Sequence, residues 1–131
     1  MKIDESSLLP IYIQIADAIE EAIVRGDLTE GSPCYSQLVL ARELQVNPAT
    51  AAKGINLLVT RGILVKNRGQ AMTVAPHAAA AIRERKQKEE WEARVRELAE
   101  LSMTLGISEE TLTGHIHEIM TVGNCETRLQ S

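Results

Sequence analysis

The chain has 131 residues, of which 44% are hydrophobic and 24% charged, which is the composition of a folded globular protein. No apolar run approaches the ~20 residues that span a bilayer, and no secretory signal is evident near the first residue, so we expect a cytoplasmic protein without a membrane partner. The net charge of −4 excludes a strongly basic surface, so any nucleic-acid contact must come from a local patch.

Residues 8–25 are predicted to form the first helix. Pro10 suits its first turn, where a missing N–H is harmless, and Gly26 can end it as a C-terminal cap. Its apolar stripe repeats every four residues, through Ile11, Ile15, Ile19 and Ile23.

Two short helices joined by a tight turn are predicted next. Ser36 is a good N-cap for a helix that ends at Leu44. Asn47 can cap a third helix, with Pro48 in its first position, and this helix runs to about Thr60. Two helices with a turn of this length are the core of a helix-turn-helix.

Residues 63–66 and 72–75 are strand-like runs on either side of Asn67-Arg68-Gly69-Gln70, which predicts a β-hairpin with its glycine at the tip. Helix, helix-turn-helix and hairpin is the order of elements in a winged helix. Pro76 follows the hairpin, so the first domain is predicted to span residues 1–76.

Residues 77–131 are predicted to form two helices that are separated by Gly106, with Ser108 as the cap of the second. A helical pair of this size cannot bury its apolar seams within one chain, and a two-fold partner would cover them. We therefore expect a mainly α protein, a winged helix-turn-helix followed by a two-helix dimerisation region. The predicted seams consist of Trp91, Val95, Leu98, Leu105, Leu112, Ile116 and Met120. A stripe that lines a cofactor is the alternative, but such seams more often serve packing.

About half of the chain, residues 8–75, resembles the DNA-binding domain of the GntR family of bacterial repressors. The matching segments are Ile11-Tyr12-Ile13-Gln14-Ile15-Ala16, Gly26-Asp27-Leu28, Val46-Asn47-Pro48-Ala49-Thr50 with Lys53, and Arg68-Gly69. The Asn-Pro pair and the short C-terminal region are similar to the YtrA-type subfamily. The resemblance implies a dimeric transcription regulator, in this case a repressor, that binds a two-fold-symmetric operator in double-stranded DNA.

The chain departs from the family pattern at several positions. Cys34-Tyr35-Ser36 stands where Leu-Pro-Ser is usual, and Leu38 stands where an arginine is common. Gly54 replaces a common alanine, at a cost of about 1 kcal/mol in a helix interior. The missing arginine removes one DNA contact that the resemblance would imply.

The candidate DNA-binding residues lie at the start of the two helices and at the hairpin tip. A recognition helix reads base edges with its N-terminal residues, while nearby groups and backbone N–H donors hold phosphates. Arg68 at the hairpin tip can enter the minor groove or bind a phosphate. Simple capping by Asn47, a solvated Lys53 and an ordinary polar turn at Arg68 are the structural alternatives. The full set is Ser36, Gln37, Asn47, Ala49, Thr50, Lys53, Arg68, Gly69 and Gln70.

No catalytic or metal-binding pattern accompanies these residues. His115 and His117 are two residues apart on a helix and point to different sides, without a partner at ligand spacing. Cys34 and Cys125 are far apart in the sequence, and we expect both to be reduced thiols; a disulfide or a redox switch is the alternative. We therefore expect no enzyme activity and no cofactor.

Two functions remain. The first is a homodimeric, DNA-binding transcription regulator; a small-molecule effector, if there is one, would need the groove between two copies. The alternative is a winged-helix protein-interaction module without DNA-binding activity. The Asn47–Lys53 helix and the Arg68 wing favour the first.

Overall fold

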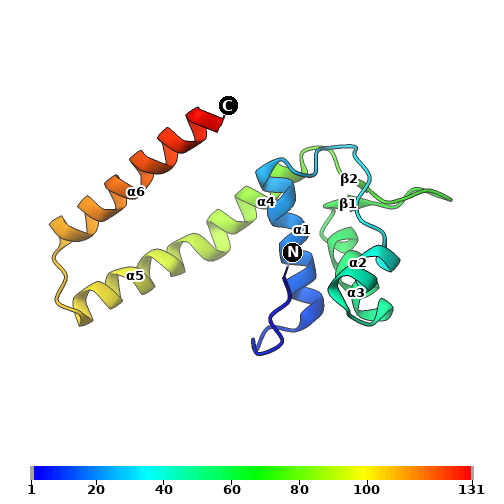
Figure 1. Ribbon diagram of the computed structural model, residues 1–131, viewed down its shortest axis with the longest axis horizontal. Coiled ribbons are helices and arrows are strands. Elements are labelled where there is room, and N and C mark those ends of the chain that lie inside the picture. Colours follow the sequence, from blue (N-terminus) through cyan, green and yellow to red (C-terminus); the bar gives the residue numbers. More distant parts are fainter. Residues whose placement is uncertain (1, 131) are drawn as a thin grey trace. The chain divides into compact units, whose positions relative to one another are not determined.

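The computed structural model describes the backbone of residues 2–130 and the side chains of residues 2–123. The chain divides into two compact units, Met1–Lys86 and Gln87–Ser131. Figure 1 shows helices α1 to α4 and the hairpin of β1 and β2, which belong to the first unit, and the long helices α5 and α6, which belong to the second.

The first helix, α1 (Ile11–Arg25), begins later than predicted because Pro10 has the extended ψ of 145°. It ends as predicted at Gly26, whose φ of 90° lies in the left-handed region that glycine tolerates best. One face of α1 is fully buried in the core of the first unit.

The helix-turn-helix is confirmed. In α2 (Gln37–Leu44) the Ser36 hydroxyl accepts a hydrogen bond from the backbone N–H of Val39. The left-handed Gln45 ends this helix, and α3 (Pro48–Thr60) starts after Asn47, whose side chain accepts from the N–H of Ala49. Both caps act as predicted, so local sequence signals set the bounds of the two helices.

The wing is a short antiparallel hairpin of β1 (Leu64–Val65) and β2 (Thr73–Val74), with Leu64 opposite Val74. Its strands are shorter than the predicted runs. The loop before α2 adds a further segment: the Cys34 N–H donates to the Met72 carbonyl at 2.8 Å, and a bridge joins Pro33 to Thr73. The wing is therefore anchored to the chain that leads into the helix-turn-helix.

The first compact unit extends beyond the predicted boundary at Pro76 and includes α4 (Ala78–Lys86). Ala78 and Ile82 are 1% and 0% exposed and join the core, and Arg83 donates to the Val24 carbonyl at the end of α1. Pro76 ends the wing but does not end the domain, because the apolar face of α4 packs against α1.

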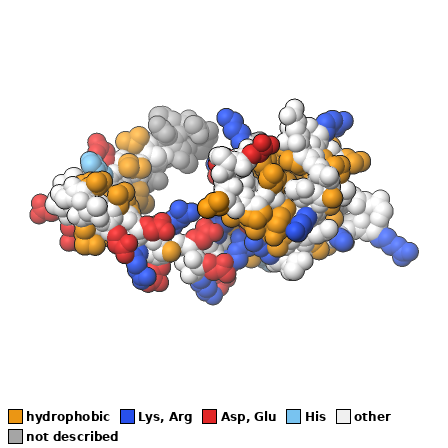
Figure 2. Space-filling model, turned by 90° about the horizontal axis from the view of Figure 1, so that it is seen from below, with side chains coloured by type: hydrophobic (Ala, Val, Ile, Leu, Met, Phe, Trp, Pro, Cys, Tyr) orange, Lys and Arg blue, Asp and Glu red, His pale blue; other side chains and the backbone are white. Residues whose placement is uncertain are grey.

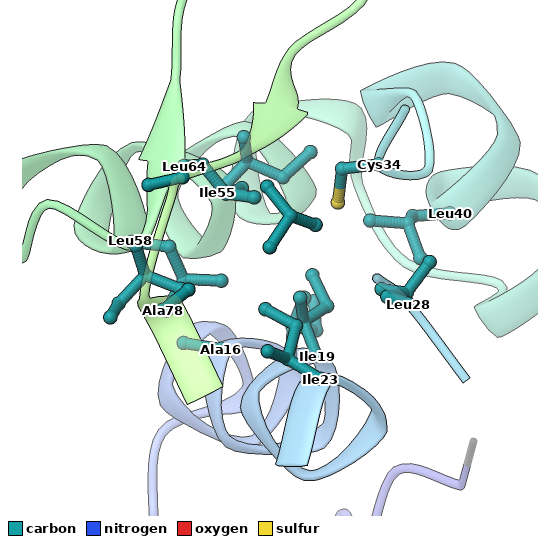
Figure 3. Packing of buried hydrophobic residues seen from close by; sticks show 14 of the residues in the cluster. Ala16, Ile19, Ile23, Leu28, Cys34, Leu40, Ile55, Leu58, Leu64 and Ala78 are labelled. Atoms are coloured by element: carbon teal, nitrogen blue, oxygen red, sulfur yellow. The ribbon is translucent and has the colours of Figure 1, made fainter. Parts of the chain in front are cut away.

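The core of the first unit is entirely aliphatic apart from one thiol. Figure 3 shows side chains from α1, α3, the hairpin and α4 that converge on one space, with the Cys34 sulfur pointing into it. The buried cluster comprises Ile15, Ala16, Ile19, Ile23, Leu28, Cys34, Leu40, Ala41, Ala51, Ile55, Leu58, Ile63, Leu64, Val74, Ala75, Ala78 and Ile82.

A buried carboxylate lies beside this core. Glu20 of α1 is 0% exposed, and its Oε1 accepts from Arg61 at 2.9 Å and from Arg85 at 2.7 Å. Its Oε2 has no hydrogen-bond partner among the described residues. Because Arg61 follows α3 and Arg85 lies on α4, one carboxylate connects three helices.

The second unit contains a π-helical turn, η1 (Gln87–Trp91), followed by α5 (Glu92–Thr104) and α6 (Glu109–Gln130). Gly106 separates the two long helices as predicted, and the Ser108 hydroxyl accepts from the Thr111 N–H at 3.1 Å. Among the side chains described in this unit, only Ser102 is buried. Within residues 2–130, no helix is long and apolar enough to cross a membrane.

Candidate nucleic-acid interface

The start of α2, the outer side of α3 and the wing surround a hollow with a volume of about 210 Å³. Ser36, Gln37 and Gln70 contribute to its lining, so the fold brings together candidate residues from two separate segments. The hollow lies on the same unit as the two helix N-termini, whose backbone donors favour anions.

The exposed strip of α3 is formed by Ala49, Lys53 and Asn56, with Thr50 half-buried beside it. The Asn47 Oδ1 accepts from the Ala49 N–H at 2.8 Å, so the capping role is observed. This bond uses the carbonyl oxygen of the side chain and leaves its amide group as a donor at the start of the strip.

Lys53 is exposed but has a partner within the protein. Its Nζ lies 4.1 Å from the centroid of the Tyr12 ring on α1. This distance is within the ~6 Å range of a cation–π interaction. The alternative for Lys53 was a solvated side chain without a role. The contact with Tyr12 shows that the exposed ammonium group also has a partner within the protein.

The wing tip presents Arg68 on an anchored turn. The Gln70 N–H donates to the Asn67 carbonyl at 3.1 Å, and Gly69 has the φ of 71° that glycine adopts readily. The Asn67 amide donates to the Ala71 carbonyl at 3.1 Å and to the Thr73 hydroxyl at 3.0 Å. Arg68, Gly69 and Gln70 are all exposed.

The start of α2 carries less positive charge than the family pattern implies. Leu38 is 70% exposed, so the position that commonly holds arginine faces solvent here as well. The Ser36 oxygen already caps the helix, which leaves its O–H to donate, and Gln37 is exposed beside it.

Cys34 is a free thiol that is 7% exposed, and burial raises its pKa. A buried thiol with a raised pKa is a poor nucleophile, which fits a packing role. The side chain of Cys125 lies outside the described residues. The described residues contain no group of three or more His, Cys, Asp and Glu side chains that could hold a metal ion.

The charge is unevenly divided between the two units. Residues 1–86 contain ten Lys and Arg against nine Asp and Glu, whereas residues 87–131 contain four against nine. The excess negative charge of the chain therefore belongs to the second unit. Figure 2 shows acidic and hydrophobic side chains interspersed on that unit, on the left of the view.

Sequence reasoning missed three residues of this interface. The sequence pointed to Tyr12 only as part of the segment Ile11–Ala16 that resembles the GntR family, and it did not point to Ala52 or Asn56, although both line the hollow. Asn56 follows Ala49 by two helical turns, so the α-helical period could have identified it. The contact of Tyr12 with Lys53 joins α1 to α3, and no pattern of neighbouring residues in the sequence could have predicted it.

No family model matches the chain. The chain is similar to the uncharacterized HTH-type transcriptional regulator YhcF of Bacillus subtilis (strain 168), with 33% identity over 107 residues that cover 80% of this chain and 86% of YhcF. It is also similar to the structure of YtrA from Sulfolobus acidocaldarius, a GntR-family transcription factor, with a TM-score of 0.56 and 30% identity over 95% of this chain and 99% of that one.

The DNA-binding domain of AraR, in a crystal structure with operator ORX1, is a third similar protein. It has a TM-score of 0.52 and 26% identity, and the match covers 57% of this chain and 93% of that domain. A DNA-binding domain that is similar to about half of this chain is therefore seen in complex with operator DNA.

Proposed function

This chain belongs to the GntR family of transcription regulators, and on that premise we propose that it is a homodimeric repressor that binds a two-fold-symmetric operator. We propose that the chain is a YtrA-type regulator, with a short helical region in place of an effector domain, and that it acts in the cytoplasm. The observation that carries the proposal is the exposed strip of α3, with Lys53 on one side and the wing on the other.

We assign base reading to the N-terminal half of that strip. Asn47 has an amide donor, Ala49 has a methyl group that suits the thymine methyl, and Thr50 has a hydroxyl group. These groups face the major groove if α3 enters it as recognition helices do.

Phosphate binding falls to the groups around the strip. We assign the phosphates on the two sides of the groove to the backbone N–H donors at the start of α2 and to the side chains of Ser36, Gln37 and Lys53. Arg68 reaches outward from the wing tip, supported by Gly69 and Gln70. Few of these groups are charged, so we expect the salt dependence of binding to be at the shallow end for a dimeric regulator.

The second unit provides the dimer interface in this proposal. Of the predicted seam, Trp91, Val95, Leu98, Leu105, Ile116 and Met120 are exposed and Leu112 is half-buried. Soluble proteins rarely expose so much apolar surface, and a second copy related by a two-fold axis covers both seams. An effector, if one acts here, binds in the groove between the two copies.

The test is selection of operator sequences from a random duplex pool by the full-length chain. We expect enrichment of an inverted repeat, because two recognition helices related by a two-fold axis read two half-sites. Arg68→Ala should weaken binding to the selected duplex, whereas Arg25→Gln, which removes the same charge from the exposed end of α1, should not. A chain that enriches no sequence and binds no duplex would favour the protein-interaction alternative.

A further inference from the structure

The exposed strip of α3 has two different sides. On one side Ala52, Ile55 and Asn56 line the hollow that the wing shares. On the other side Lys53 and Gly54 face α1. Successive residues of an α-helix are turned by about 100°, so Lys53 lies at the α1 edge of the strip and not at its centre.

Lys53 is held at this edge by an aromatic ring. The distance from its Nζ to the centroid of the half-buried Tyr12 ring is 4.1 Å. A free lysine side chain has many rotamers, whereas attraction to the ring face favours those that keep the ammonium group over Tyr12. The ring is fixed because α1 belongs to the core.

A glycine sets the spacing of the two helices at the same point. A Cβ atom at Gly54 would lie 2.9 Å from the Tyr12 carbonyl oxygen and 3.0 Å from the Ile15 Cγ2 atom. The first distance is too short for a real Cβ contact with a backbone atom and the second is tighter than most, so a larger residue would push α1 and α3 apart at this point. The close approach at Gly54 brings the Tyr12 ring within reach of the neighbouring Lys53.

We infer that Tyr12 is a positioning residue for DNA binding, whose ring holds the Lys53 ammonium group at the α1 edge of the strip for a backbone phosphate. This inference rests on the proposed DNA-binding function. Lys53 is then a phosphate contact and not a reader of base edges, which lie toward the centre of the strip. Because the Lys53 side chain is already ordered, it loses less conformational entropy on binding DNA than a solvated lysine would lose.

The test uses a fluorescein-labelled duplex of random sequence, about 30 base pairs long, because phosphate contacts are independent of sequence. Fluorescence polarisation with the full chain is measured between about 50 and 200 mM salt. Lys53→Met should weaken binding and flatten the salt dependence by about one unit. Arg25→Gln is the control with the same loss of charge.

Tyr12→Leu keeps an apolar side chain but removes the ring, and it should weaken binding about two- to five-fold, the change that matches the ~0.5–1 kcal/mol of an exposed cation–π contact. Tyr12→Phe keeps the ring and should restore binding. In the Lys53→Met background, Tyr12→Leu should have no further effect, because the group that it positions is gone.

A second measurement reads the contact without DNA. The NMR signals of the Lys53 ε-methylene group should be shifted upfield by the ring in the wild-type chain and in Tyr12→Phe, and should lose this shift in Tyr12→Leu. Thermal unfolding of the three proteins shows whether they are equally folded.

If Lys53→Met weakens duplex binding but Tyr12→Leu leaves binding unchanged or tightens it, the inference is wrong and the proposed function stands. If the wild-type chain binds no duplex, the proposed function fails and the inference fails with it, although the NMR shift still reports the contact.

Discussion

Residues 2–86 and residues 87–123 use aliphatic side chains in opposite ways. In the first unit Ile15, Ile19, Leu58 and Ile82 are less than 2% exposed, and four helices and a hairpin share one core. In the second unit Leu98, Leu101 and Met120 are 43%, 53% and 63% exposed. The first unit has a shared core of its own, whereas these apolar side chains of the second unit are exposed in the single chain.

The two units also differ in charge and in the role of their helix surfaces. The first is close to neutral and presents polar and basic groups on α3 and the wing, while the second has more than twice as many acidic as basic residues. A near-neutral unit is repelled from DNA less than the total charge implies. The proposed division of labour, in which the first unit binds DNA and the second unit associates with a second copy, would account for both differences, and the following experiments test it.

The largest effect should come from loss of the second unit. A fragment of residues 1–86 should be a folded monomer that binds the operator about 10²–10⁴-fold more weakly than the full chain, because its second half-site no longer binds in an intramolecular step. Sedimentation equilibrium and fluorescence polarisation check both statements. The fragment ends after Lys86 because α4 belongs to the core.

Leu98→Glu in the full chain should have the same effect, since it places a charge in the proposed interface. Met103→Glu is the matched control, because Met103 is 73% exposed and lies off the predicted seam. A full-length chain that is monomeric, or a fragment that dimerises and binds as tightly as the full chain, would show that the second unit has another role.

The next effect concerns α4, which sequence reasoning had placed with the second unit. Ile82 is fully buried, so Ile82→Ala in the 1–86 fragment should lower the free energy of unfolding by about 2–5 kcal/mol. Leu8→Ala, at a completely exposed position, should change it by less than about 0.5 kcal/mol. Urea denaturation measures both values. Equal stability of fragments 1–76 and 1–86 would return α4 to the second unit.

A pair of helix glycines gives a sharper comparison. At Gly54 an added Cβ would meet the Tyr12 carbonyl at 2.9 Å, so Gly54→Ala should destabilise the protein by about 1–3 kcal/mol despite the better helix propensity of alanine. At Gly114 in α6 nothing lies within 4 Å of an added Cβ, and Gly114→Ala should stabilise its helix by about 1 kcal/mol.

Thermal unfolding should therefore shift in opposite directions for these two substitutions. Two stabilising shifts would mean that α1 and α3 can separate at little cost, and that the glycine does not set their spacing.

The smallest effect is a gain of affinity at Leu38. Because this side chain is 70% exposed at the start of the helix-turn-helix, Leu38→Arg should add a phosphate contact and tighten duplex binding about two- to five-fold at low salt. The gain should shrink as the salt concentration rises. Leu8→Arg, another exposed leucine, is the control, and equal gains from both would indicate a general charge effect.

Features that depend on a few neighbouring residues were predictable from the sequence. Ser36, Asn47 and Ser108 cap their helices, Gly26 and Gly106 end theirs, and the Arg68-Gly69 turn joins two strands. Each of these signals acts within about four residues, through hydrogen bonds to the adjacent backbone or through the φ angles that glycine tolerates. With the α-helical period of the apolar residues, they suffice for the winged helix and for most of the candidate interface.

Contacts between segments far apart in the chain were decided only by the tertiary structure. Glu20 and Arg85 are 65 residues apart and form a partly buried ion pair, and Ile82 joins a core that begins at Ile15. The Tyr12–Lys53 contact depends on how closely two helices cross at Gly54. A sequence pattern shows that a helix has an apolar face, but which partner covers that face depends on packing among all the elements, and this packing placed α4 with the first unit.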